Sequence, residues 1–186
     1  PYFSNPQPSY FSDGTETITT NDGYATTFYL YNFTQQKYDY YIAGIDGEGF
    51  RDGLSLKIDS NDNGYPSDIL YFQGSYYVLW SVYNNTTKLS ELHILKLDED
   101  GSVAWRRTFD LDGHSFWYGR LRESRDSKLL VSFYAHDWDE DSNLMGWQKL
   151  SGNETAADTK FINYPNQITA GDYLEYVCLL YTSDAA

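Results

Sequence analysis

A repeat of about 52 residues constrains the fold of this chain more than any single motif does. Turn-forming residue pairs recur at that spacing, at Asp22-Gly23, Gly74-Ser75 and Asp126-Ser127. Each pair leads into an aromatic or aliphatic run, at Tyr24–Tyr31, Tyr76–Tyr83 and Lys128–Ala135. A fixed period of this length is the signature of repeat architectures, in which each copy forms one supersecondary unit. The 186 residues therefore hold about three such units, and a fourth copy begins at Ile168–Tyr173.

Within each copy, apolar residues alternate with polar ones or form short runs between clusters of Asp, Asn, Gly and Ser. This pattern is typical of short β-strands joined by turns, and no segment carries the periodicity of a long helix. The best-preserved copy predicts four strands, at Ile69–Gln73, Tyr76–Tyr83, Glu91–Leu97 and Ser102–Phe109. A four-stranded antiparallel unit of about 50 residues is the blade of a β-propeller. We therefore predict an all-β fold, a fragment of a β-propeller with about three blades, and an all-β sandwich is the alternative.

The connection between the third and fourth predicted strands of the middle copy carries a recognisable motif. Lys96–Trp105, with the sequence KLDEDGSVAW, is followed by RRTF at Arg106–Phe109. The motif resembles the K-L-D-x-x-G-x-x-x-W signature of quinoprotein-like (PQQ-like) β-propeller repeats, which are common in secreted and cell-surface bacterial proteins. The resemblance implies that Trp105 packs between blades. It extends as a pattern over most of residues 15–176, with the whole motif in the middle copy.

The repeat also predicts where each unit begins and ends. We expect residues 1–14 to be a lead-in or the end of a preceding blade, residues 15–67, 68–119 and 120–167 to be blade-like repeats, and residues 168–177 to start a fourth. Cys178–Ala186, with the sequence CLLYTSDAA, resembles the translation of a transposon-end sequencing adapter, so the natural sequence is expected to end near Tyr176 or Val177. The single cysteine lies in that tail. We therefore expect neither a disulfide nor a cysteine-ligated zinc in the repeats.

The charge of the chain limits its partners. It has 13 Lys and Arg residues against 27 Asp and Glu residues, a formal net charge of -14. Nucleic acids and anionic membrane surfaces require a basic face, so neither is an expected partner. The longest apolar runs are only a few residues, which excludes a membrane-inserted helix. Together with the resemblance, these features favour an extracellular or cell-surface location, with the periplasm as the alternative.

The segment Asp59–Asp68, with the sequence DSNDNGYPSD, contains the sharpest candidate metal site. Oxygen-bearing side chains at alternate positions of a tight loop converge on one hard cation, and Gly64 permits the bend. The segment also resembles the D-x-N-x-D-G-Y-P-D loop of calcium-binding repeats in integrin-like propellers. We predict calcium as the one cofactor, with four ligands: Asp59, Asn61, Asn63 and Asp68. The alternative is a turn between blades, because Asn, Asp and Gly tolerate turn geometry.

A second acidic segment, Asp137–Asp141, contains an aromatic residue among its carboxylates. An exposed Trp138 between Asp137 and Asp139 is suited to stacking a sugar ring while the carboxylates accept hydrogen bonds from its hydroxyls. We predict these three residues as ligand contacts. The alternatives are a cation site and a solvated blade-edge loop. Trp80 and Trp105 lie in strand-like runs and are expected in the core.

Catalytic chemistry has little support in the sequence. The three histidines, His93, His114 and His136, are isolated, and no nucleophile elbow, zinc-protease motif or phosphate-binding glycine loop is present. We therefore assign no catalytic residue and predict a binding or scaffold module for a glycan or a surface protein. The alternative is a propeller hydrolase acting on glycans, whose catalytic carboxylates come from different blades around the axis and lie partly outside these repeats.

Overall fold

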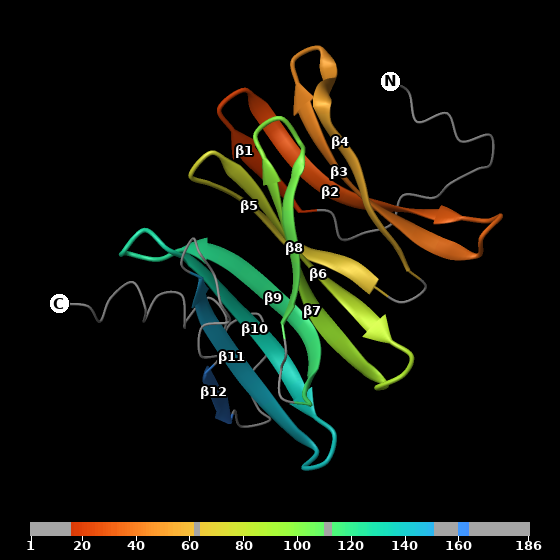
Figure 1. Ribbon diagram of the computed structural model, residues 1–186, viewed down its shortest axis with the longest axis vertical. Helices are drawn as coiled ribbons and strands as arrows, with labels where there is room; N and C mark the ends of the chain where they lie inside the picture. The colour runs from red at the N-terminus through yellow and green to blue at the C-terminus, as the bar shows by residue number, and fades with distance from the viewer. Residues whose placement is uncertain (1–15, 62–63, 110–112, 151–159, 164–186) are drawn as a thin grey trace.

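The computed structural model describes residues 16–61, 64–109, 113–150 and 160–163. Within them, the strands form three four-stranded sheets (Figure 1), which we name blades A, B and C. Blade A contains β1 (Thr17–Thr20), β2 (Gly23–Asn32), β3 (Lys37–Asp46) and β4 (Gly49–Asn61). Blade B contains β5 (Gly64–Phe72), β6 (Ser75–Asn84), β7 (Leu89–Asp98) and β8 (Val103–Phe109). Blade C contains β9 (Ser115–Glu123), β10 (Leu129–Asp137), β11 (Ser142–Leu150) and β12 (Lys160–Asn163).

Each blade is an antiparallel meander in which every strand pairs with the next one in the chain. The predicted all-β fold of three blades is confirmed. The turns at Asp22-Gly23, Gly74-Ser75 and Asp126-Ser127 each join the first strand of a blade to the second, as the repeat predicts. The first strands also lie side by side, since β5 contacts both β1 and β9. None of the described residues belongs to a helix long and apolar enough to cross a membrane.

The strands of blade B follow the predicted ones closely, with one difference at its start. The sequence predicts a first strand from Ile69, whereas β5 begins at Gly64 and includes Pro66. Proline lacks the backbone N–H of a sheet ladder and is tolerated where a strand has a partner on one side only. The strand β5 is such an edge strand, since it pairs only with β6 and carries an irregularity between Pro66 and Asp68.

The two faces of blade B pack against different neighbours. Along β6, Tyr76, Val78 and Trp80 belong to the core shared with blade A. The intervening Tyr77 and Leu79 belong to the core shared with blade C. Alternate side chains of a strand point to opposite faces, so a strand covered on both sides reads as a continuous apolar run. Trp80, with 1% of its surface exposed, is in the core as predicted.

Trp105 also lies against a core, at its margin. It is partly buried on β8 and packs against the cluster between blades B and C. Its ring centroid is 6.0 Å from that of Tyr77, and the guanidinium of Arg107 lies 4.8 Å from its ring centroid. One face of the indole therefore contributes to the packing between blades.

Blade C contains a glycine that packing requires. A Cβ atom at Gly146 on β11 would overlap the ring of Phe133, which is 1% exposed. We expect Gly146→Ala to lower the free energy of unfolding by about 1–3 kcal/mol, because a close-packed core accommodates an added methyl group only by shifting. Gly47→Ala is the matched control, since a Cβ there meets nothing within 4 Å. Chemical denaturation of both variants measures the difference, and equal stabilities would contradict this packing.

Candidate ligand-binding surface

The turn between the second and third strands is closed in the same way in all three blades. Its first residue accepts hydrogen bonds through Oδ1 from the backbone N–H groups two and three residues later, at 2.8–3.3 Å. These first residues are Asn32, Asn84 and Asp137. The three turns lie along the same side of the sheets (Figure 1). Asp137 therefore shapes its turn through Oδ1, and the N–H groups of Glu140 and Asp139 hold the pKa of Asp137 below its ordinary value.

The residue after this turn-closing position is an exposed aromatic in two of the three blades. Phe33 is 42% exposed and Trp138 is 58% exposed, while the middle blade has Asn85. Each aromatic meets the residue two positions before it edge to face, Tyr31 at 4.9 Å and His136 at 4.4 Å. Phe33 stays exposed although blade A packs against blade B. The aromatic at this turn position is therefore exposed in blades A and C alike.

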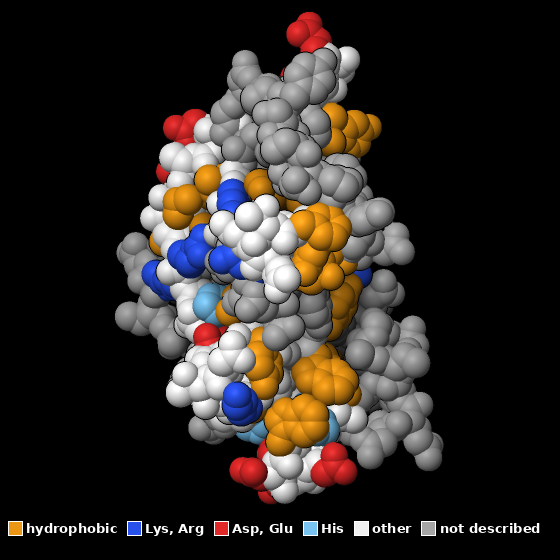
Figure 2. Space-filling view, turned by 90° about the vertical axis from the view of Figure 1, so that its right-hand side faces the viewer, with side chains coloured by type: hydrophobic (Ala, Val, Ile, Leu, Met, Phe, Trp, Pro, Cys, Tyr) orange, Lys and Arg blue, Asp and Glu red, His pale blue; other side chains and the backbone are white. Residues whose placement is uncertain are grey.

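Trp138 belongs to a surface group that we name the tryptophan platform, formed by the exposed Trp117 and Trp138 and the buried His136. The His136 ring centroid lies 5.6 Å from that of Trp117 and 4.4 Å from that of Trp138, and the two indoles are 6.4 Å apart. Trp117 is 44% exposed. Figure 2 shows hydrophobic side chains gathered beside histidine and acidic side chains at the lower end of the molecule, where the β10–β11 turn lies in Figure 1. Neighbouring aromatic faces of this kind offer a stacking surface to a ring-shaped ligand.

His136 brings a hydrogen-bonding group to the platform. Its side chain is 9% exposed, and its Nδ1 lies 2.9 Å from Oδ1 of Asn143. An amide oxygen only accepts, so Nδ1 donates to Asn143, and Nε2 is the ring nitrogen left for a ligand. Nε2 makes no hydrogen bond within the described structure, and its acidic neighbour Asp141 is 3.6 Å away. A buried polar atom without a partner incurs a desolvation cost that a ligand hydroxyl offsets.

Acidic side chains form the rim of the platform. Asp139, Glu140 and Asp141 are exposed on the β10–β11 turn. Oδ2 of Asp137 lies 3.4 Å from Nε2 of His114, which comes from the segment before β9. The rim therefore offers hydrogen-bond acceptors and negative charge, which suits neutral or cationic ligands better than polyanions.

A second charged group lies where the first strands of the blades meet. Glu16, Asp68 and Arg120 are spaced 52 residues apart and so occupy equivalent positions in the three repeats. Nη1 of Arg120 donates to Oε1 of Glu16 at 2.6 Å and lies 3.8 Å from Oδ1 of Asp68. One guanidinium nitrogen from blade C thus faces carboxylates associated with blades A and B. We name these residues the axial group.

Asp68 ties blade B to blade C. Its Oδ2 accepts from the backbone N–H of Leu121 at 2.7 Å and from Nη1 of Arg122 at 3.2 Å, and its Oδ1 accepts from the N–H of Ile69 at 2.9 Å. The side chain is 4% exposed. Burial raises the pKa of Asp68, while the Leu121 N–H and the two arginines act in the opposite direction.

Three of the four predicted calcium ligands lie in described strands at the junction of blades A and B. Asp59 and Asn61 lie on β4 and Asp68 lies on β5, while Asn63 is outside the described residues. Both oxygens of Asp68 already accept hydrogen bonds, Oδ2 from Leu121 on β9 and Oδ1 from Ile69 on β5. No group of three or more His, Cys, Asp or Glu side chains that could hold a metal ion occurs in the described part of the chain. The calcium site stays a prediction.

The three predicted ligand contacts, Asp137, Trp138 and Asp139, lie at the β10–β11 turn, and Trp117 and His136 lie beside Trp138. Their role as ligand contacts stays a prediction. The period of two along β10 puts residues 134, 136 and 138 on one face, so the sequence alone could have predicted that His136 lies beside Trp138. Trp117 could not be placed there in the same way. It lies opposite an irregularity in the β9–β10 pairing between Tyr134 and Ala135, which brings its ring beside Tyr134 at 5.8 Å.

Comparison with known proteins identifies similar folds. No family model and no curated protein sequence matches the chain. Among solved structures, it is similar to CoXyl43, a GH43 β-xylosidase/α-arabinofuranosidase from a compost microbial metagenome, in complex with xylotriose in a calcium-free form. The TM-score is 0.52 at 7% identity, over 83% of this chain and 59% of the enzyme chain. An endo-1,4-β-xylanase from Bacteroides thetaiotaomicron VPI-5482 gives a TM-score of 0.49 at 13% identity, over 85% and 60% of the two chains.

The similarity to the GH43 enzyme concerns the fold alone. GH43 enzymes are propellers, which agrees with the blades described above. The chain spans about three fifths of the length of either enzyme chain (59% and 60%). Membership of the quinoprotein-like family stays a prediction, because no family model matches.

Proposed function

We propose that this chain is part of an extracellular or cell-surface β-propeller that binds a glycan without turning it over. The observation that supports the proposal most is the tryptophan platform, where two exposed indoles lie beside a buried histidine whose Nε2 makes no hydrogen bond in the described structure. The C–H face of a sugar ring packs against an aromatic face, and sugar hydroxyls donate to acceptors at its edge. His136 Nε2 and the carboxylates of Asp137 and Asp139 are such acceptors.

Charge narrows the class of glycan. The chain carries a net charge of -14, and the platform rim is acidic. Like charges facing each other across an interface oppose binding, so the ligand is a neutral or amino-substituted glycan rather than a uronic or sulfated one. A surface protein that presents such a glycan is the corresponding macromolecular partner.

A glycan array with the full chain, followed by product analysis, tests this proposal. Xylotriose is a sensible first probe, because the structurally similar GH43 enzyme was solved with it. We expect retention of a neutral glycan and no release of shorter sugars over a long incubation. Binding restricted to polyanionic glycans, or no binding to any glycan, would contradict the proposal.

Glycan hydrolysis is the second candidate function, and the axial group favours it. Glu16 and Asp68 are carboxylates associated with separate blades, and both face Arg120. Glycosidases need two carboxyl groups in different environments, and Asp68 is buried with a raised pKa while Glu16 is partly exposed. Against this, both Asp68 oxygens accept structural hydrogen bonds. New reducing ends that disappear in Asp68→Asn would favour this candidate over the binding module.

A further inference from the structure

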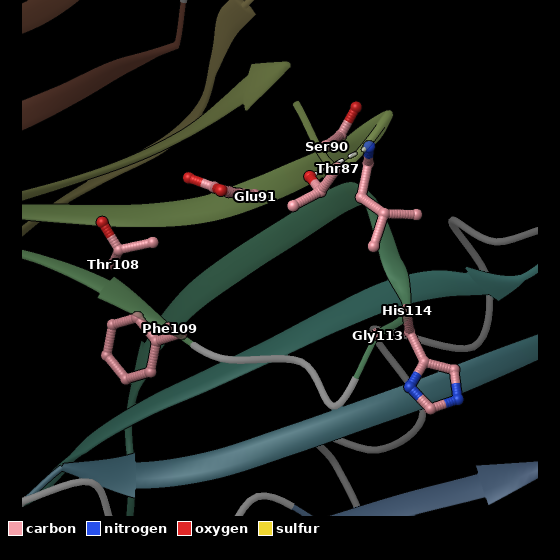
Figure 3. Close-up of a pocket in the computed structure, with 8 residues that line it drawn as sticks. Thr87, Ser90, Glu91, Thr108, Phe109, Gly113 and His114 are labelled. Carbon is pink, nitrogen blue, oxygen red and sulfur yellow. Dashed lines mark hydrogen bonds between the residues drawn. The ribbon is translucent and has the colours of Figure 1, made fainter. Parts of the chain in front are cut away.

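A cavity of about 350 Å³ opens between blades B and C (Figure 3). Its described lining comes from the β6–β7 turn and the start of β7, from the end of β8 and from the segment before β9. The lining residues that matter for the argument are Thr87, Ser90, Glu91, Thr108, Phe109 and His114. The volume falls within the range typical of small-molecule sites.

The polar groups of this cavity are held in place by its surroundings. Oε1 of Glu91 accepts from Nδ2 of Asn84 at 2.5 Å, and Oε2 of Glu91 lies 3.2 Å from Nε2 of His93. The hydroxyl of Thr108 lies 3.2 Å from Nδ1 of the same histidine. The backbone N–H of Ser90 donates to Oγ of Ser115 across the two blades at 3.0 Å. Hydroxyls and a carboxylate fixed in this way reduce the ordering cost of binding a polar ligand.

The cavity has one aromatic wall. Figure 3 shows Phe109 and His114 on one side of the cavity and the hydroxyl-bearing Thr87 and Ser90 on the other. A small concave site with an aromatic surface and several hydroxyls matches the mixed apolar and polar surface of a sugar ring. The carboxylate of Glu91 excludes anionic sugars from it for the same reason as the acidic rim of the platform.

One contact joins the cavity to the platform. His114 lines the cavity, and its Nε2 lies 3.4 Å from Oδ2 of Asp137. Asp137 stands between His136 and Trp138 in the chain, so this contact connects a residue that lines the cavity with the rim of the platform. The cavity and the tryptophan platform are therefore adjacent.

We propose that the cavity is a second subsite of the same surface, so the ligand is an extended neutral oligosaccharide with one ring on the tryptophan platform and another in the cavity. This inference rests on the proposed glycan-binding function. It predicts that affinity grows with chain length until both positions are filled, because the second contact forms within an already bound ligand.

The test is calorimetric titration of the full chain with xylo-oligosaccharides and cello-oligosaccharides of two to six units. We expect the hexamer of the bound series to have about tenfold higher affinity than the dimer. In Thr108→Phe, which fills the cavity from an exposed strand position, the ratio of the two affinities should fall to about one. Thr19→Phe, an equal substitution at an exposed position of β1, should keep the tenfold ratio.

The possible results separate the two proposals. Binding that depends on Trp138 but has the same affinity for dimer and hexamer would overturn the second subsite and leave the glycan-binding function standing. An unchanged ratio in Thr108→Phe would do the same. No binding of any member of either series, together with an empty glycan array, would overturn both. If Thr108→Phe fails to fold, Thr108→Val, which replaces the hydroxyl with a methyl group, is a second variant with a smaller expected loss of the affinity ratio.

Discussion

Replacing Trp138 with alanine is expected to weaken oligosaccharide binding about thirtyfold, roughly 2 kcal/mol. The indole is 58% exposed and meets His136 and Trp117 at one surface, so its removal deletes the stacking face and opens Nε2 of His136 to water. Large aromatic side chains dominate the energetics of binding surfaces in this way. Titration of the parent and the variant with the same oligosaccharide measures the loss.

Phe33→Ala is the matched control for that experiment. Phe33 occupies the equivalent turn position in blade A and is 42% exposed, yet its edge-to-face neighbour is Tyr31 rather than a histidine. We expect its affinity to stay within about twofold of the parent value. Equal losses of affinity in both variants would show that any exposed aromatic at this turn contributes non-specifically to binding. Unchanged affinity in Trp138→Ala would show that the tryptophan platform is not the binding site.

Replacing Asp68 with alanine is expected to destabilise the fold by about 3–5 kcal/mol. The change leaves the buried N–H of Leu121 without its acceptor and removes the carboxylate that pairs with Arg122. For a chain of this size, each kcal/mol lowers the melting temperature by roughly 2–4 °C. Thermal unfolding followed by circular dichroism measures the shift. Glu99→Gln is the control, because that exposed carboxylate accepts a bond from the Tyr71 hydroxyl at the surface.

Asp68→Asn supplies a second readout that depends on pH. The asparagine side chain keeps an oxygen that accepts from the N–H of Leu121, but it has no carboxyl group to titrate. Because burial raises the pKa of Asp68 in the folded state, the folded protein binds more protons than the unfolded chain between the ordinary pKa of 3.8 and that raised pKa. The stability of the parent relative to Asp68→Asn should therefore fall as pH rises through this window. A difference that grows with pH would contradict the buried placement of the carboxylate.

The blade architecture could be predicted from the sequence because each copy repeats the same local pattern of turn residues and apolar runs. The turn pairs 52 residues apart and the two-sided apolar run of β6 encode strands and their order without any knowledge of tertiary contacts. The same repeat places Asn32 and Asn84 at the head of equivalent turns. Asp137 takes that role one residue later than the 52-residue spacing predicts. It is identified by the hydrogen bonds that its Oδ1 accepts from the turn, not by its position in the repeat.

The functional details depend on contacts between blades, which local patterns do not encode. Asp68 lies in a segment rich in residues that bind metals, which is why the sequence predicted a calcium ligand. The sequence does not show that the N–H of Leu121 and the arginines of β9 contact its carboxylate. The cavity lined by Glu91 and His114 exists only where two blades meet. The equal spacing of Glu16, Asp68 and Arg120 is visible in the sequence. Because one of the three is basic and two are acidic, they do not stand out as a repeated residue, and only the packing of the blades shows that they form one charged group.

The tryptophan indole N–H signals in a ¹⁵N NMR titration test the central claim most directly. The chain has five tryptophans, Trp80, Trp105, Trp117, Trp138 and Trp147, and single substitutions by phenylalanine assign their signals. On addition of the oligosaccharide, we predict shifts at Trp117 and Trp138, no shift at the buried Trp80, and no new sugar signals over days. Shifts confined to Trp80 or Trp105, or the appearance of shortened sugar products, would contradict a non-catalytic glycan site on the tryptophan platform.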